Sequence, residues 1–105
     1  MDTFSALADP NRRHIIELIA ARGQLSATDI SDKFKVSPPA ISQHLKILRQ
    51  AKLVDMEKQA QKRIYTINTK SLVELETWVH KMTKMWNARF DRLDELLADE
   101  KRKFI

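Results

Sequence analysis

Ser42, Gln43 and Lys46 bring three kinds of polar group into one short stretch of the chain. A hydroxyl, a carboxamide and an ammonium group can together form hydrogen bonds with base edges and ion pairs with phosphates. The apolar residues around them recur with helical spacing, so a helix here buries one side and exposes the polar groups on the other. These apolar residues are Ile41, Leu45 and Leu48. The pattern fits nucleic-acid reading, but two ordinary packed helices with a solvated face would also show it.

The segment that carries these groups has the signals of a helix start. Ser37 is a good N-cap, and Pro38 follows at the first helical position, where its missing N–H costs nothing. A shorter helix is predicted just before it, over residues 26–34, with Ser26 as its cap. Residues 26–50 are therefore predicted to form a helix-turn-helix whose second helix can enter the major groove of DNA.

After Leu53 the apolar and polar side chains alternate, which is typical of strands. Strands are predicted over residues 53–57 and 63–68, with a polar, cationic tip at residues 58–62, so that residues 53–68 form a wing. We expect this basic hairpin to contact phosphates or the minor groove, the alternative being an exposed loop that uses lysine for solubility. The candidate DNA contacts of both elements are Ser37, Pro39, Ser42, Gln43, Lys46, Arg49, Lys58, Gln61, Lys62 and Arg63.

Positive charge is concentrated where these candidates lie. The chain of 105 residues has a net charge of +5. Residues 44–65 alone hold six basic and two acidic side chains, whereas residues 1–43 are balanced. A polyanion would be attracted mainly to this segment, although a charge run is often only a solvated face.

Two helices are predicted before the helix-turn-helix. The first covers residues 3–8, and Asp9 then caps a second over residues 10–22. Gly23, the only glycine, stands where the C-terminal cap of that helix needs a left-handed residue. The expected fold is mainly α with a small β-hairpin, a winged helix-turn-helix of order α-α-(β)-α-α-β-β-α, in one domain over residues 1–105.

A long helix is predicted over residues 70–97, because its apolar residues recur with a period of roughly 3.6. They offer more apolar area than the small body before them can cover, so we expect a second copy of the chain to cover it. The alternative is a helix folded over its own core. The predicted homodimer interface consists of Phe4, Leu7, Leu75, Val79, Met82, Trp86 and Phe90.

The chain resembles the ArsR/SmtB-type winged-helix transcriptional repressors. The resemblance is carried by FSALADPNRRHII at residues 4–16, FKVSPPAISQHLKIL at 34–48, AKLV at 51–54 and RIYTI at 63–67. It implies a dimer that binds operator DNA, an inverted repeat on the duplex, and blocks transcription of its own or a neighbouring operon. The terminal helix, with both tryptophans, resembles the branch of the family that lacks cysteine metal sites.

Two positions depart from the pattern of the family, which usually has glycine where this chain has Lys52 and again within the wing, here Gln59-Ala60-Gln61. A lysine in a left-handed cap costs on the order of 1 kcal/mol relative to glycine. The sequence therefore does not determine the geometry of the wing turn, and a longer or more mobile tip is one expectation.

Metal sensing is the main alternative within the family. The chain has no Cys, so a thiolate site is excluded. The spacing of the terminal-helix zinc site leaves His80, Asp91 and Asp94 as candidate ligands, with Trp78 in the first position. Because exposed helices commonly carry such acids, we expect no metal and no cofactor.

Other classes of protein are less compatible with the sequence. It has no Gly-rich phosphate loop and no arrangement of nucleophile and base, so we do not expect an enzyme. A protein-interaction module should show exposed apolar anchors where this chain has polar groups. Neither a signal peptide nor a transmembrane run is visible, so a cytoplasmic protein is expected, with no membrane partner. The operator sequence and any inducer are not specified.

Overall fold

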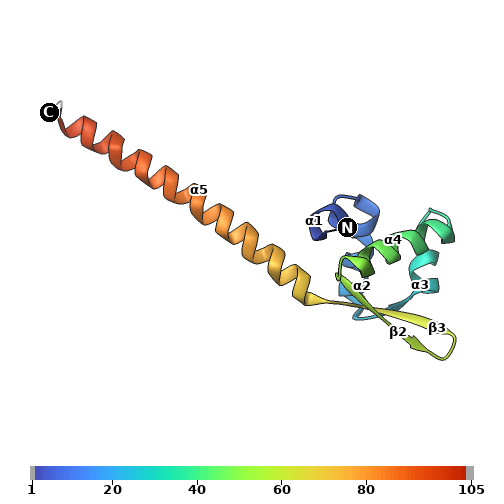
Figure 1. Ribbon diagram of the computed structural model, residues 1–105. Coiled ribbons are helices and arrows are strands. Elements are labelled where there is room, and N and C mark those ends of the chain that lie inside the picture. Colours follow the sequence, from blue (N-terminus) through green and yellow to red (C-terminus); the bar gives the residue numbers. More distant parts are fainter. Residues whose placement is uncertain (1, 104–105) are drawn as a thin grey trace. The chain divides into compact units, whose positions relative to one another are not determined.

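The computed structural model describes residues 2–103, with side chains up to residue 98 (Figure 1). Its contacts divide the chain into a first unit, residues 1–75, and a second unit, residues 76–105, which are described separately. The elements follow the predicted order. In chain order they are α1 (Thr3–Leu7), α2 (Pro10–Arg22), β1 (Leu25–Ser26), α3 (Ala27–Asp32), α4 (Pro38–Gln50), β2 (Val54–Gln59), β3 (Lys62–Ile67) and α5 (Thr69–Lys103). The single-domain organisation stays a prediction.

The helices of the first unit begin where the capping residues predict. The Asp9 carboxylate accepts from the backbone N–H groups of Asn11 and Arg12 at 2.8 and 3.1 Å. Ser26 and Asp29 form a reciprocal capping box at the start of α3. Ser37 accepts from the Ala40 N–H at 3.3 Å and caps α4. Each cap satisfies amide groups that a helix start leaves without partners.

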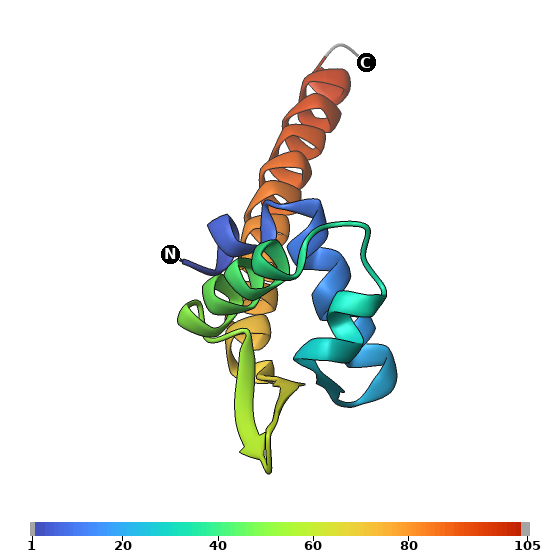
Figure 2. The same ribbon diagram turned by 90° about the vertical axis from the view of Figure 1, so that its right-hand side faces the viewer.

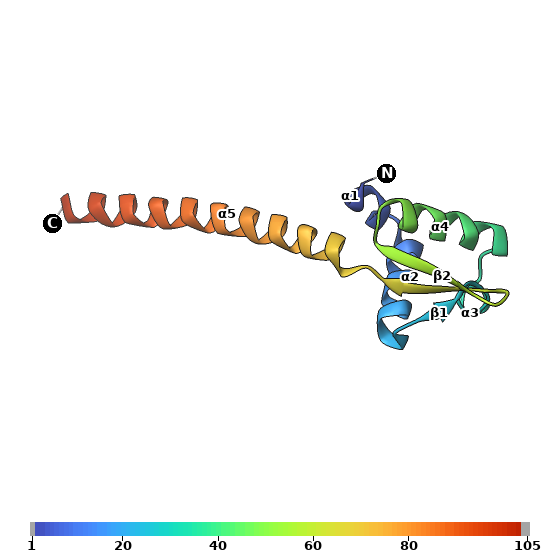
Figure 3. The ribbon, with the colours of Figure 1, turned by 60° about the horizontal axis from the view of Figure 1, so that its bottom comes forward.

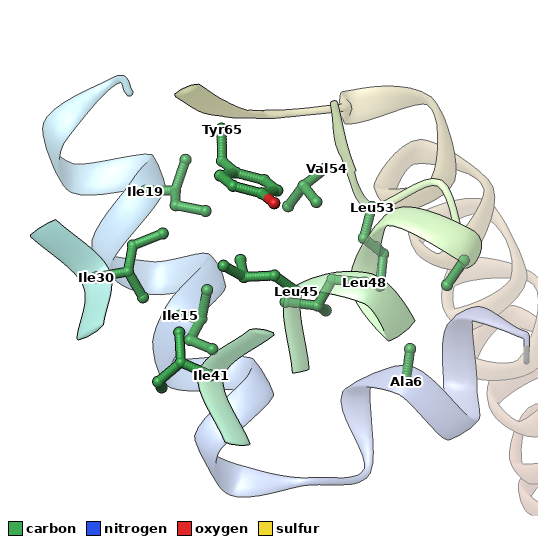
Figure 4. Close-up of a cluster of buried hydrophobic side chains, with 11 residues drawn as sticks. Ala6, Ile15, Ile19, Ile30, Ile41, Leu45, Leu48, Leu53, Val54 and Tyr65 are labelled. Atoms are coloured by element: carbon green, nitrogen blue, oxygen red, sulfur yellow. The ribbon is translucent and has the colours of Figure 1, made fainter. Parts of the chain in front are cut away.

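The core of the first unit lies between α2, α3, α4 and the sheet. Figure 4 shows Ile15 and Ile19 of α2 pointing toward Leu45 of α4, with Tyr65 of β3 beside them. Each fully buried aliphatic side chain contributes roughly 1.5–3 kcal/mol relative to exposure. The remaining members of the core are Ala6, Ile30, Ile41, Leu48, Ala51, Leu53 and Val54. This core fixes α4 against the sheet and leaves the opposite face of α4 in solvent.

Strand β3 is the central strand of an antiparallel sheet in the order β1-β3-β2. The hairpin of β2 and β3 closes with the pairs Lys58–Arg63 and Gln59–Lys62, so its turn contains only Ala60 and Gln61. The predicted tip of residues 58–62 was therefore too long. Ala60 adopts a φ of +57°, which an alanine tolerates at a cost of about 1 kcal/mol, and this lets the turn close tightly without glycine.

Helix α4 ends in a motif that normally uses glycine. The Leu53 N–H donates to the Leu48 carbonyl and the Lys52 N–H to the Arg49 carbonyl, both at 3.0 Å. This is the bond pattern of a Schellman cap, and its left-handed position is Lys52, with a φ of +60°. The left-handed conformation expected for Lys52 is confirmed.

Helix α5 extends beyond the predicted residues 70–97 at both ends. Asn68 caps its start, accepting from the Lys70 N–H at 3.0 Å. Within the first unit, the buried Ser71 hydroxyl donates to the Lys52 carbonyl at 2.9 Å, which joins the first turn of α5 to the end of α4. Among the described residues, no helix combines the length and apolarity needed to cross a membrane.

Candidate nucleic-acid interface

The polar face of α4 is exposed as the sequence predicts. Ser42, Gln43, Lys46 and Arg49 all lie in solvent, while the opposite face of the helix is buried. At the start of the helix Pro39 is exposed too. Ser37 is also exposed, but its hydroxyl already accepts the bond that caps α4. The face offers hydrogen-bonding groups and cations, and lacks the apolar anchors that a protein-binding face would need.

A cleft of about 390 Å³ separates this face from the wing. Figure 3 shows α4 lying along the hairpin of β2 and β3. The structure thus brings residues of α4 and β3 around one cleft, although β2 lies between these elements in sequence. The cleft is lined by Ser42, Gln43, Leu45, Lys46 and Arg49 of α4, by Arg63 and Tyr65 of β3, and by Ala27 of α3.

Tyr65 and Ala27 were not among the predicted site residues. Tyr65 is nearly buried, and it lies two positions from Arg63 on the same strand. Alternate residues of a strand share one face, so the position of Arg63 was a signal that Tyr65 would lie beside it. Ala27 gave no comparable signal, because it reaches the cleft only through the packing of α3.

The wing directs its cations to both faces of the hairpin. Lys58 and Arg63 are paired across the strands, on the face that also carries Tyr65. Gln59 and Lys62 are paired on the other face. Two like charges directly opposite one another destabilise a hairpin, and a bound polyanion would relieve that repulsion. Gln61 lies in the exposed turn, which points away from the helices in Figure 2.

The described part of the chain does not neutralise these cations. The side chains of Lys46, Arg49, Lys58, Lys62 and Arg63 form no ion pair or hydrogen bond with any other residue that the structure describes. A cleft lined by unpaired cations raises the local concentration of a polyanion. The electrostatics therefore favour a phosphate backbone as the ligand.

The predicted dimer contacts fall on both units. In the second unit Val79, Trp86 and Phe90 are roughly half exposed, and Met82 is partly buried. The rings of Trp86 and Phe90 meet edge to face at a centroid distance of 5.1 Å. In the first unit Phe4 is 49% exposed, while Leu7 and Leu75 are partly buried.

The candidate metal ligands His80, Asp91 and Asp94 are exposed on α5. Among the residues whose side chains the structure describes, no three His, Cys, Asp or Glu residues lie close enough together to hold a metal ion. The described side chains therefore offer no metal centre, and the expectation that none exists stays a prediction.

A helix-turn-helix followed by a cationic hairpin defines a winged-helix DNA-binding protein. Residues 9–56 match the bacterial regulatory proteins of the arsR family. The chain is 37% identical over 78 residues to the transcriptional repressor SdpR of Bacillus subtilis, which covers 74% of this chain and 86% of that protein. It is 33% identical over 97 residues to the HTH-type transcriptional regulator Rv2034 of Mycobacterium tuberculosis, covering 92% and 87%.

Solved structures agree with these relatives. A possible transcriptional regulator for arsenical resistance superposes with a TM-score of 0.71 at 31% identity, covering 94% of this chain and 96% of that one. An ArsR-like transcriptional regulator from Rhodococcus sp. RHA1 gives a TM-score of 0.77 at 25% identity, covering 89% and 87%. The chain belongs to the ArsR family. It is a DNA-binding transcriptional regulator, not an enzyme.

Proposed function

We propose that the chain acts as a homodimeric repressor that binds an inverted-repeat operator and controls its own or a neighbouring operon. The observation that carries this proposal is the cleft between α4 and the wing, in which Ser42 and Gln43 stand among three unpaired cations. Its relative SdpR is named a transcriptional repressor. Because the proposed operator lies on chromosomal DNA, we infer that the chain acts in the cytoplasm.

Each side of the cleft has its own role in this proposal. Ser42 and Gln43 read base edges in the major groove, where a carboxamide pairs bidentately with adenine. Pro39 packs against a base or sugar, and Ser37 lies beside the backbone at the start of α4. The cations hold phosphates or enter the minor groove, and they fix the register of the helix without reading sequence. They are Lys46, Arg49, Lys58, Lys62 and Arg63, with Gln61 at the wing turn.

The exposed apolar face of α5 supports a second copy as the partner. Trp86, Phe90 and Leu93 are each about half exposed or more, and a lone helix in water does not retain such a face without cost. A copy related by a two-fold axis covers the same face on both chains. The two recognition helices then meet half-sites about 10 bp apart, or a multiple of that, on one side of the duplex.

Selection of duplexes from a random library by the purified chain tests the proposal. We expect an inverted repeat, bound with an affinity that falls steeply as salt rises, because each neutralised phosphate releases counterions. Sedimentation of the free chain at micromolar concentration should give a dimer. Recovery of no preferred sequence, or of a single half-site bound by a monomer, would contradict the proposal.

A further inference from the structure

Arg12 of α2 has the most connected side chain of the first unit among the described residues. Only 12% of it is exposed. Its Nε donates to the Ala6 carbonyl at 2.7 Å, and a terminal nitrogen donates to the Ser5 carbonyl at 3.2 Å. Its other terminal nitrogen lies 3.5 Å from Nδ1 of His44 and 4.0 Å from the Asp9 carboxylate. One guanidinium thus contacts α1, the start of α2 and the recognition helix α4.

Helix α1 depends on such contacts because it has only five residues. A helix this short is unstable alone, and its last carbonyl groups lack partners within the helix. Arg12 binds the Ala6 carbonyl and also the Ser5 carbonyl, which accepts from the Ala8 N–H as well. Arg13 donates to the next two carbonyls, of Leu7 and Ala8, at 2.8 and 3.4 Å. Both arginines therefore cap α1, where positive charge is favourable.

Only one of the two arginines reaches the recognition helix. Because a guanidinium has donors only, Arg12 can donate to Nδ1 of His44 when the neutral ring carries its proton on Nε2. His44 is half-buried and directly follows Gln43, the residue proposed to read bases. The hydrogen bonds of the Arg13 side chain to described residues both end at α1 and its C-cap. Figures 2 and 3 show α1 beside α4.

We propose that Arg12 is a positioning residue for DNA reading, which sets the orientation of α4 by tying His44 to α1. The inference rests on the proposed function. The contact between Arg12 and His44 matters because bidentate base contacts tolerate little displacement of α4, whereas phosphate contacts through long side chains tolerate more. Loss of Arg12 should therefore weaken binding to the preferred duplex more than binding to unrelated DNA.

Arg12→Gln and Arg13→Gln form a matched pair for the test. Both remove one charge and bonds to two carbonyls of α1 and its C-cap, but only the first also breaks the contacts with His44 and with the Asp9 carboxylate. Arg12→Lys is a milder variant, which keeps the charge at α1 but lacks the fork needed to reach α1 and α4 together. Urea unfolding first identifies which variants are folded. We then measure how each folded variant binds two duplexes, one selected by the wild-type chain and one unrelated to it.

We expect Arg12→Gln and Arg12→Lys to lower affinity for the selected duplex by about five- to tenfold, with less effect on the unrelated duplex. Arg13→Gln should stay within about twofold of the wild type. In a His44→Ala background, Arg12→Gln should cause no further loss of affinity, because the tie is already absent. Equal losses for the two arginines, or losses that multiply in the double variant, would overturn the inference. A wild-type chain that selects no duplex would instead refute the proposed function.

Discussion

Lys52 and Ala60 are the two non-glycine residues with positive φ among those described. Both stand at turns that bracket β2, one at the end of α4 and one at the tip of the wing. An L side chain in this region costs about 1 kcal/mol relative to glycine, so each turn is retained at the expense of stability. The surrounding hydrogen bonds hold both conformations in place.

Lys52→Gly should raise the free energy of unfolding by up to about 1 kcal/mol, because glycine adopts the left-handed region without strain. The gain is limited by the greater freedom of glycine in the unfolded chain. Urea unfolding measures it, with Gln50→Gly as control. Gln50 ends α4 in the right-handed region, so glycine there should destabilise the chain. A loss of stability in Lys52→Gly would show that the lysine side chain supports the cap.

Gln43 and Lys62 should respond differently to replacement by alanine. Gln43→Ala should cost about 1–3 kcal/mol at one base position per half-site and leave other positions unchanged. Lys62→Ala should weaken binding to every sequence and lower the salt slope by about one unit for each phosphate that the lysine neutralises. A dimer carries each substitution in both chains, so the loss of base specificity and the loss of phosphate contacts should each occur at both half-sites. Identical profiles for the two variants across a panel of operator substitutions would refute the assignment of helix to bases and wing to backbone.

At the scale of single elements, the start of α2 carries the network that holds α1 and α4. Burial raises the pKa of Asp9, but bonds from the Arg12 and Asn11 amides and the charges of His44 and Arg12 outweigh it, so the net pKa lies below 3.8. A carboxyl whose pKa is lowered by folding stabilises the folded state when it is ionised. The start of α2 should therefore weaken in acid.

Asp9→Ala should cost about 0.5–2 kcal/mol near neutral pH, the usual value of an N-cap. Asp9→Asn keeps a capping oxygen and isolates the charge. The contribution of the charge is fully present above pH 3.8 and disappears as the pH falls through the lower pKa of the folded state. Urea unfolding at about pH 6 and about pH 3 should show the wild type approaching Asp9→Asn in acid. A gap between them that does not shrink would mean that Asp9 contributes only hydrogen bonds.

At the scale of the whole molecule, the exposed face of α5 is the surface on which we propose that a second copy of the chain binds. Trp86 is 59% exposed in the single chain, and aromatic side chains at the centre of an interface dominate its energy. Trp86→Ala should weaken the proposed dimer by about 2–4 kcal/mol, measured by sedimentation over a range of concentrations. Lys84→Ala is the control, since it lies on nearly the opposite side of the helix. A dimer unaffected by Trp86→Ala would place the interface elsewhere.

Much of the fold was predictable because its signals are local. Asp9, Ser26 and Ser37 each cap a helix within their own few residues, and the change from helical to alternating periodicity after Leu53 predicts the wing. The exposed face of α4 follows from the same spacing. Capping bonds and side-chain periodicity depend on neighbours in the chain, so sequence alone determines them.

The length of the wing turn and the cleft itself required the tertiary structure. The lack of glycine in the wing favoured a longer turn. The pairing of β2 with β3 outweighs the conformational preference of Ala60, so the turn closes tightly at this residue. Arg63 and Tyr65 reach α4, and Arg12 reaches His44 across 32 positions of sequence, only because the shared core packs α2, α4 and β3 together. Contacts between distant segments depend on how the core is packed, and no local pattern encodes that geometry.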